Sequence, residues 1–136
     1  MSRICEEVQN MIATAPASLA AATDSTPVYI DGSGFPTLDF VIAHAGMAAG
    51  KSLTVKVMCS ANANGADADE IGSYVKTYDA AVTNGAVTVS VDVQGNRDRY
   101  YAVVFQHDNT SAVQCCAVAL GKPIYRPPDR VGVILW

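Results

Sequence analysis

The sequence is poor in aromatic residues and in positive charge, and both shortages narrow its possible functions. Aromatic side chains make up 7% of the 136 residues, and the only tryptophan is the last residue. Lysine and arginine number 9 against 13 aspartates and glutamates, which gives a formal net charge of −4. A net negative chain without a basic run disfavours binding to the phosphates of nucleic acid or to an anionic membrane surface. We therefore expect neither a nucleic-acid partner nor a membrane partner.

Long apolar runs are absent as well. The longest apolar stretches fall well short of the ~20 residues that a transmembrane helix needs. The first ten residues carry Glu6 and Glu7, where a secretory signal would have a basic start followed by an apolar run. These features favour a soluble protein that is made in the cytoplasm.

Residues suited to catalysis are scarce. The chain contains two histidines, His44 and His107, and an activated nucleophile would need one of them within reach. His44 ends an expected strand, where a partly covered structural histidine is the simpler interpretation. His107 precedes Asp108, and the two could act as a base and its orienting carboxylate, but an ordinary polar turn explains the pair more simply. We therefore predict that the protein is not an enzyme and has no catalytic residues.

The cysteines give no sign of a metal site. Cys5, Cys59, Cys115 and Cys116 show neither a CxxC motif nor the spacing of metal ligands. Cys115 and Cys116 are adjacent in an expected strand, so their side chains point to opposite faces and a bridge between them would be strained. Two interpretations stay open: small buried hydrophobic residues with free thiols, and a disulfide between Cys59 and Cys116 on facing strands.

One acidic loop offers oxygen ligands. The segment SANANGADADEIGS, residues 60–73, brings together side chains of the kind that hold a hard cation such as calcium. They are Asn62, Asn64, Asp67, Asp69 and Glu70. Their spacing differs from that of an EF-hand loop, and no glycine-rich phosphate loop stands between a strand and a helix. We therefore predict no metal and no cofactor, and a bound ion in this loop remains the alternative.

Alternating small apolar residues are abundant and predict strands. Valine recurs at every second position from Val87 to Val93, which is the period of a strand with one buried face. Residues 99–106 are apolar on both faces, as in a strand inside a sheet. Together with residues 111–120, these runs predict an antiparallel meander. The segments 28–30, 38–42, 53–59 and 74–78 predict further strands, and Asn84-Gly85 is a hairpin signal.

Seven or eight short strands at roughly regular spacing favour a β-sandwich or jelly roll. The two ends of the chain differ from this core. Residues 2–12 carry one stripe of an amphipathic helix, residues 17–26 form an Ala-rich arm, and the prolines of residues 122–136 exclude a helix or a central strand.

We therefore divide the chain into an N-terminal segment (1–26), a β-sandwich domain (27–121) and an extended C-terminal arm (122–136). The apolar side chains of both ends are predicted to form a subunit or capsid interface. They are Ile4, Val8, Ile12, Val131, Val133, Ile134, Leu135 and Trp136.

Several stretches together resemble small structural proteins of tailed-bacteriophage virions. The likeness lies in the short strand and aspartate-glycine turn before LDFVI, the loop after LTVKV, the strand RYYAVVF and the Pro-rich stretch after ALGKPIY. It covers about residues 19–128 and is strongest to the capsid decoration (cement, head-stabilising) type.

The resemblance implies a jelly-roll-like antiparallel β-sandwich that binds the outside of a capsid as a homotrimer and stabilises it. The implied partner is the major capsid protein and the implied location is the virion surface, after synthesis in the host cytoplasm. No catalytic residues come with it. The alternatives are a tail or neck component, and a carbohydrate- or receptor-binding β-sandwich module, for which the six tyrosines could supply platforms.

Overall fold

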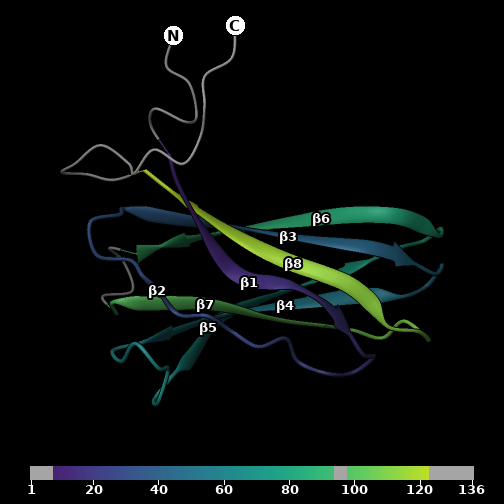
Figure 1. Ribbon diagram of the computed structural model, residues 1–136, viewed down its shortest axis with the longest axis horizontal. Coiled ribbons are helices and arrows are strands. Elements are labelled where there is room, and N and C mark those ends of the chain that lie inside the picture. The colour runs from purple at the N-terminus through teal and green to yellow at the C-terminus, as the bar shows by residue number, and fades with distance from the viewer. Residues whose placement is uncertain (1–7, 94–97, 123–136) are drawn as a thin grey trace, which may run out of the picture.

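Residues 8–93 and 98–122, which the computed structural model describes, form two antiparallel sheets packed face to face (Figure 1). Sheet A holds four strands in the order β1-β8-β3-β6, and sheet B holds four in the order β2-β7-β4-β5. Sheet A lies above sheet B in Figure 1. The strands are β1 (Gln9–Leu19), β2 (Ile30–Asp31), β3 (Thr37–Met47), β4 (Ser52–Ser60), β5 (Asp69–Thr77), β6 (Val82–Asp92), β7 (Tyr100–His107) and β8 (Val113–Gly121). Within these ranges, the structure has no helix of the length and apolar character that a membrane span requires.

The strands pair like a long hairpin that has been rolled up. β1 pairs with β8, β2 with β7, β3 with β6 and β4 with β5, all antiparallel, and residues 61–68 form the turn at the end of the hairpin. Two further antiparallel pairs, β3 with β8 and β4 with β7, join these ribbons into sheets. This nested pairing of eight strands is the jelly roll. The predicted jelly-roll-like antiparallel β-sandwich is therefore confirmed.

The core lies between the sheets, where alternate residues of each strand meet. Leu38, Phe40 and Ile42 of β3 are completely buried, and so are Leu53 and Val55 of β4. The residues between them are half-buried or exposed. Because successive side chains of a strand point to opposite faces, the alternation that predicts these strands also identifies the core.

The predicted meander is wrong. β6 and β8 both pair with β3 in sheet A, whereas β7 lies between β2 and β4 in sheet B. Alternation identifies a strand with one buried face, but both sheets of a sandwich offer such a face, so the pattern does not select the neighbour. The expectation that residues 99–106 lie inside a sheet is confirmed, because β7 has a partner on each side.

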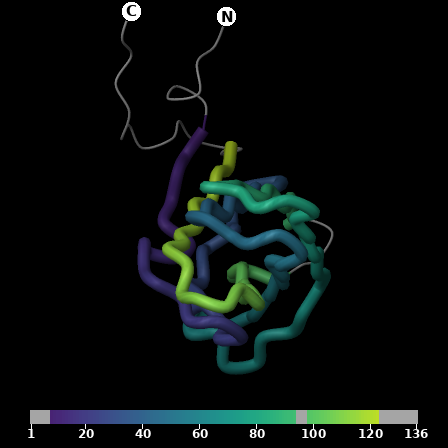
Figure 2. The backbone as a smooth tube through the Cα atoms, turned by 90° about the vertical axis from the view of Figure 1, so that its right-hand side faces the viewer, coloured from purple at the N-terminus to yellow at the C-terminus, as the bar shows by residue number. Residues whose placement is uncertain are grey.

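The N-terminal segment is part of the sandwich. Residues 9–12, predicted as the end of a helix, begin β1, which runs beside β8 (Figure 2). The helical stripe rested on a few apolar residues in one short segment, and pairing along a whole strand outweighs that local preference. Pro16 lies at the second of two shifts in the β1–β8 register, on the edge of sheet A, where a missing N–H removes no ladder bond. Residues 2–7 of the predicted helix lie outside the described ranges.

The predicted Ala-rich arm is also bound to the sandwich. The backbone N–H groups of Ala22 and Ser25 donate to the carbonyls of His107 and Phe105, at 2.8 and 2.9 Å. This segment therefore lies along β7 before it reaches β2. Among the described residues the sandwich begins at residue 9, so the predicted boundary at residue 27 is wrong.

Candidate interaction surfaces

His107 has a structural role. Its Nδ1 accepts a hydrogen bond from the backbone N–H of Asn109 at 3.1 Å, so its Nε2 carries the proton and donates to the Leu19 carbonyl at 2.7 Å. The carboxylate of Asp108 accepts instead from the backbone N–H of Ser52 at 2.7 Å. The two side chains of the possible base and carboxylate pair therefore bind different partners. Each fastens a connection between strands.

His44 has a structural role as well. Its Nδ1 donates to the carbonyl of Ala45 and its Nε2 accepts from the hydroxyl of Tyr78, both at 2.6 Å. Gly85 lies directly opposite His44 in the β3–β6 pair. A Cβ at Gly85 would stand 2.6 Å from the Tyr78 hydroxyl, so the glycine makes room for this pair. Asn84-Gly85 is therefore not the predicted hairpin turn but part of β6.

The described cysteines are free thiols. Cys59 and Cys115 are buried, and burial raises the pKa of each thiol to about 11. Cys116 is half-buried and points away from the core, opposite to Cys115. The alternative of a Cys59–Cys116 disulfide is thereby excluded, because the two side chains lie on an inner and an outer face. Cys5 lies outside the described residues.

The acidic loop uses its polar side chains to form its own turns. The Asn62 amide donates to the carboxylate of Asp67, and the Asn64 side chain accepts from the backbone N–H of Ala66 at 3.0 Å. Gly65 has a φ of 71°, and a Cβ there would collide with the ring of Tyr29. In the part of the chain that the structure describes, no group of three or more His, Cys, Asp or Glu is placed to hold a metal ion.

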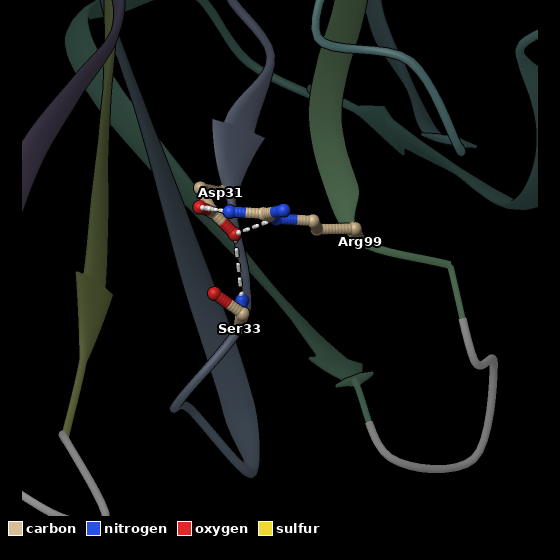
Figure 3. Close-up of polar contacts among 3 residues, drawn as sticks. All are labelled: Asp31, Ser33 and Arg99. Carbon is tan, nitrogen blue, oxygen red and sulfur yellow. Dashed lines mark hydrogen bonds and ion pairs between the residues drawn. The ribbon is translucent and has the colours of Figure 1, made fainter.

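An ion pair lies next to the start of β7. Arg99 donates to both carboxylate oxygens of Asp31, from Nε at 3.1 Å and from Nη2 at 2.8 Å, and the backbone N–H of Ser33 donates to the same carboxylate at 2.9 Å (Figure 3). The hydrogen bond from Arg99 is the main reason why the pKa of Asp31 is lowered to about 2. Asp31 lies opposite Tyr100, so this pair fastens the two-residue strand β2 to β7.

The outer face of sheet A is apolar at its centre. In the strand register Ile12 lies beside Val118, which lies beside Val41, and the next row places Cys116 beside Ala43. Ile12 is 58% exposed, and the others are half-buried although the core is on the opposite side of their strands. We call this surface the A face and define it by its six residues: Ile12, Val41, Ala43, Cys116, Val118 and Leu120.

The outer face of sheet B is different. Polar side chains interrupt its rows, as where Thr54 lies between Val75 and Gln106, and where Lys56 lies between Ser73 and Val104. The outer face of sheet A carries polar side chains too, because Leu120 lies between Asn10 and Asp39. Its two central rows, Ile12-Val118-Val41 and Cys116-Ala43, are uninterrupted, and they make the A face the candidate contact surface. The sequence signal for it was the apolar character of β3 and β8 at both odd and even positions.

A second surface lies at the sandwich edge formed by β5 and β6. All nine residues of β5 are exposed, including Tyr74 at 49% and Val75 at 52%. Between β5 and β6 runs a groove of about 530 Å³, with Val55, Val57 and Val87 among its lining residues. We call it the β5–β6 groove. Periodicity predicted the strand but could not predict that it would stay uncovered.

The structure describes two of the predicted interface residues. Ile12 belongs to the A face and Val8 is half-buried just before β1. Ile4 and the five residues of the C-terminal end lie outside the described ranges. Their role as an interface remains a prediction.

Comparison with known proteins shows the fold. No protein-family model and no curated protein matches the sequence. Among solved structures, the chain is similar to the PBSX exported protein XepA, with a TM-score of 0.56, 13% identity, and coverage of 99% of this chain and 44% of that one. It is also similar to a chain of infectious bursal disease virus, Gx strain (TM-score 0.53, 10% identity, 90% and 33% covered), and to VP2 of the subviral particle of that virus (0.52, 9%, 90% and 35%). The chain therefore spans less than half the length of each of these structures.

Proposed function

We propose that this chain is a structural protein of a virion, which binds the outside of a capsid as a trimer and stabilises it. The observation that carries the proposal is the A face. The inner faces of a jelly roll pack on each other, and an outer face that meets water is normally polar. An apolar centre on the outer face of sheet A is the kind of surface that a protein partner covers.

Other features support the same role. The fold is shared with a protein of a viral particle, and the sequence resembles phage decoration proteins. The histidines hold connections between strands, and burial keeps the thiols of Cys59 and Cys115 protonated, so they are poor nucleophiles. A contact protein without turnover fits these side chains better than an enzyme.

In this proposal the A face and the C-terminal apolar end share the contacts. The A face covers the subunit boundary or the capsid surface over a broad area, and the C-terminal apolar end reaches a neighbouring subunit. If the five apolar side chains at the C-terminus become mostly buried, the gross gain is ~5–10 kcal/mol before the cost of ordering the chain.

Light scattering on matched variants tests the proposal. Val118→Glu places a charge on the A face, and Val104→Glu places the same charge on the outer face of sheet B, where it lies opposite Lys56. Both positions are half-buried on interior strands. We expect the wild type and Val104→Glu to be trimers and Val118→Glu to lose the trimer while its circular dichroism stays β-type. A wild-type mass of one chain at every concentration would contradict the trimer.

The location is tested by imaging. A cryo-electron microscopy reconstruction of particles that carry this chain should place it as trimers on the capsid surface. Density confined to the tail or neck would overturn the decoration role and favour a tail or neck component.

A further inference from the structure

The β5–β6 groove is bordered by two strand edges. β5 ends sheet B and has β4 as its neighbour, and β6 ends sheet A and has β3 as its neighbour. Five consecutive residues of β6, positions 86–90, line the groove. Because successive side chains of a strand alternate between faces, a consecutive run shows that the edge of β6, with its backbone N–H and C=O groups, borders this space.

The walls of the groove suit an extended apolar chain. The strand register places Tyr74 opposite Val55 and Gly72 opposite Val57, so both face inward, toward sheet A. Tyr74 is nevertheless 49% exposed, because β6 does not reach across to cover it. Gly72 points into open space: a Cβ there would meet no atom within 4 Å. The groove therefore offers an apolar floor, one exposed aromatic wall and a strand edge that no other described strand pairs with.

The chain itself contains a segment of matching chemistry. Residues 131–136, VGVILW, are rich in β-branched and aromatic side chains, which favour strands. Six extended residues span ~20 Å, close to the ~17 Å of the five β6 residues that line the groove. Left in water, such an end is an aggregation hazard.

We infer that residues 131–136 of a neighbouring copy add to the edge of β6 as an extra strand and fill the β5–β6 groove. This inference rests on the proposed assembly, and it names the contact that the C-terminal end makes. Main-chain hydrogen bonds to β6 provide affinity, and alternate side chains pack against Tyr74, Val55 and Val87.

The reach of the intervening chain favours a neighbour over the same subunit. Gly121 at the end of β8 lies opposite Leu38, and Leu38 lies opposite Val91 of β6, so the two strand ends are two strand spacings apart, ~10 Å. Nine residues, 122–130, lie between Gly121 and the segment 131–136, and Pro123, Pro127 and Pro128 favour an extended chain of ~28 Å. A stiff segment of that length suits a groove on another copy better than a sharp return to its own.

Trp136 provides a direct measurement, because it is the only tryptophan of the chain. In the assembled full-length protein we expect its fluorescence to be that of a buried indole. Gly72→Phe places a ring in the groove from a position where a Cβ meets no atom within 4 Å, and we expect it to shift the emission of Trp136 to that of a solvent-exposed indole. Val75→Phe, on the opposite face of the same strand, is the matched control and should leave the emission unchanged. Equal emission in the wild type and in a folded Gly72→Phe variant would overturn the inference.

Disulfide trapping separates a neighbouring copy from the same chain. Two proteins are mixed, one with Val89→Cys in the groove and the other with Ile134→Cys, on the same face of the added strand as Trp136, and both carry Cys5→Ser and Cys116→Ser. We expect a covalent heterodimer under mild oxidation. A protein with both new cysteines that forms the bond only within one chain would refute the exchange between copies.

The two proposals fail in different ways. A wild type that is monomeric at every concentration removes the proposed assembly and with it the donated strand. The second case is a trimeric protein that forms no covalent heterodimer and whose Trp136 emission is unchanged by Gly72→Phe. That result leaves the proposed assembly intact and rejects only the donated strand.

Discussion

Replacing Gly85 by alanine is expected to destabilise the protein, although alanine usually stabilises a folded chain relative to glycine. A Cβ at this position would lie 2.6 Å from the Tyr78 hydroxyl and 2.7 Å from Nε2 of His44. Such distances are too short for a carbon atom, so the side chains must separate. The perturbation therefore acts on one hydrogen bond, between Tyr78 and His44, which is 2.6 Å long in the native protein.

The magnitude follows from the groups involved. Losing the bond costs ~1 kcal/mol net, and a buried ring nitrogen left without a partner costs ~1–3 kcal/mol. His44 is 5% exposed, so water replaces the lost partner poorly. The smaller conformational entropy of alanine in the unfolded chain offsets ~0.4–1 kcal/mol. We expect the free energy of unfolding to fall by ~1–3 kcal/mol.

Urea unfolding followed by circular dichroism at one fixed protein concentration measures this change. Gly72→Ala is the control, because its Cβ meets no atom within 4 Å, and its effect should stay within ~0.5 kcal/mol. Tyr78→Phe removes the atom nearest to the new Cβ, so Gly85→Ala should cost less in that background. The reasoning is refuted if Gly85→Ala is as stable as the wild type, or if its cost is the same in both backgrounds.

Three further changes have definite expected outcomes. In the native Cys5→Ser protein, alkylation should label Cys116 first, because the thiols of Cys59 and Cys115 are buried with a pKa of about 11; equal rates at all three, measured by mass spectrometry, would contradict this. The pKa of Asp31 is about 2 in the fold against an ordinary 3.8. The contribution of the ionised Asp31 to stability is therefore fully present above pH 3.8 and is lost as the pH falls through about 2. The melting temperature of Asp31→Asn should therefore lie slightly below that of the wild type at neutral pH and converge with it in acid, and a gap that persists in acid would exclude the ion pair as its cause. The buried hydroxyl of Thr14 has no hydrogen-bond partner within the described residues, so Thr14→Val should raise the free energy of unfolding by ~1 kcal/mol, and a loss of stability in urea unfolding would show that the hydroxyl has a partner.

The sequence predicted the strands well, because a strand's buried face is a local property. The alternation of Leu38, Phe40 and Ile42 and the valines of β6 needed no knowledge of the partner strand. Pairing depends on residues far apart in the chain, as where β1 joins β8 across about 100 positions. This is why the meander was wrong, and why the helix predicted over residues 2–12 proved to be a strand from residue 9 onward.

The interaction surfaces were harder to predict than the fold. A glycine inside a strand and a glycine in a hairpin look alike in sequence, and only the His44–Tyr78 pair explains Gly85. The A face depends on which rows of side chains become neighbours after β1, β8 and β3 align. The β5–β6 groove exists because no other described segment covers β5. The periodicity of a strand does not show whether another segment will cover it.

The chain closes one side of the sandwich and leaves the other side open among the described residues. The open side is where a partner is needed. Beside β1 and β7, residues 20–28 of the chain itself bridge the sheets: the N–H of Val28 donates to Ala13 of β1, and that of Ser25 donates to Phe105 of β7. A cleft of about 500 Å³ remains there, but its strand edges already have hydrogen-bond partners from the same chain. Beside β5 and β6, no segment within residues 8–93 or 98–122 forms such a bridge. An unpaired strand edge next to an apolar floor is a template for another chain. The jelly roll therefore closes one side with its own sequence, and the other side is where an added strand has the most to gain.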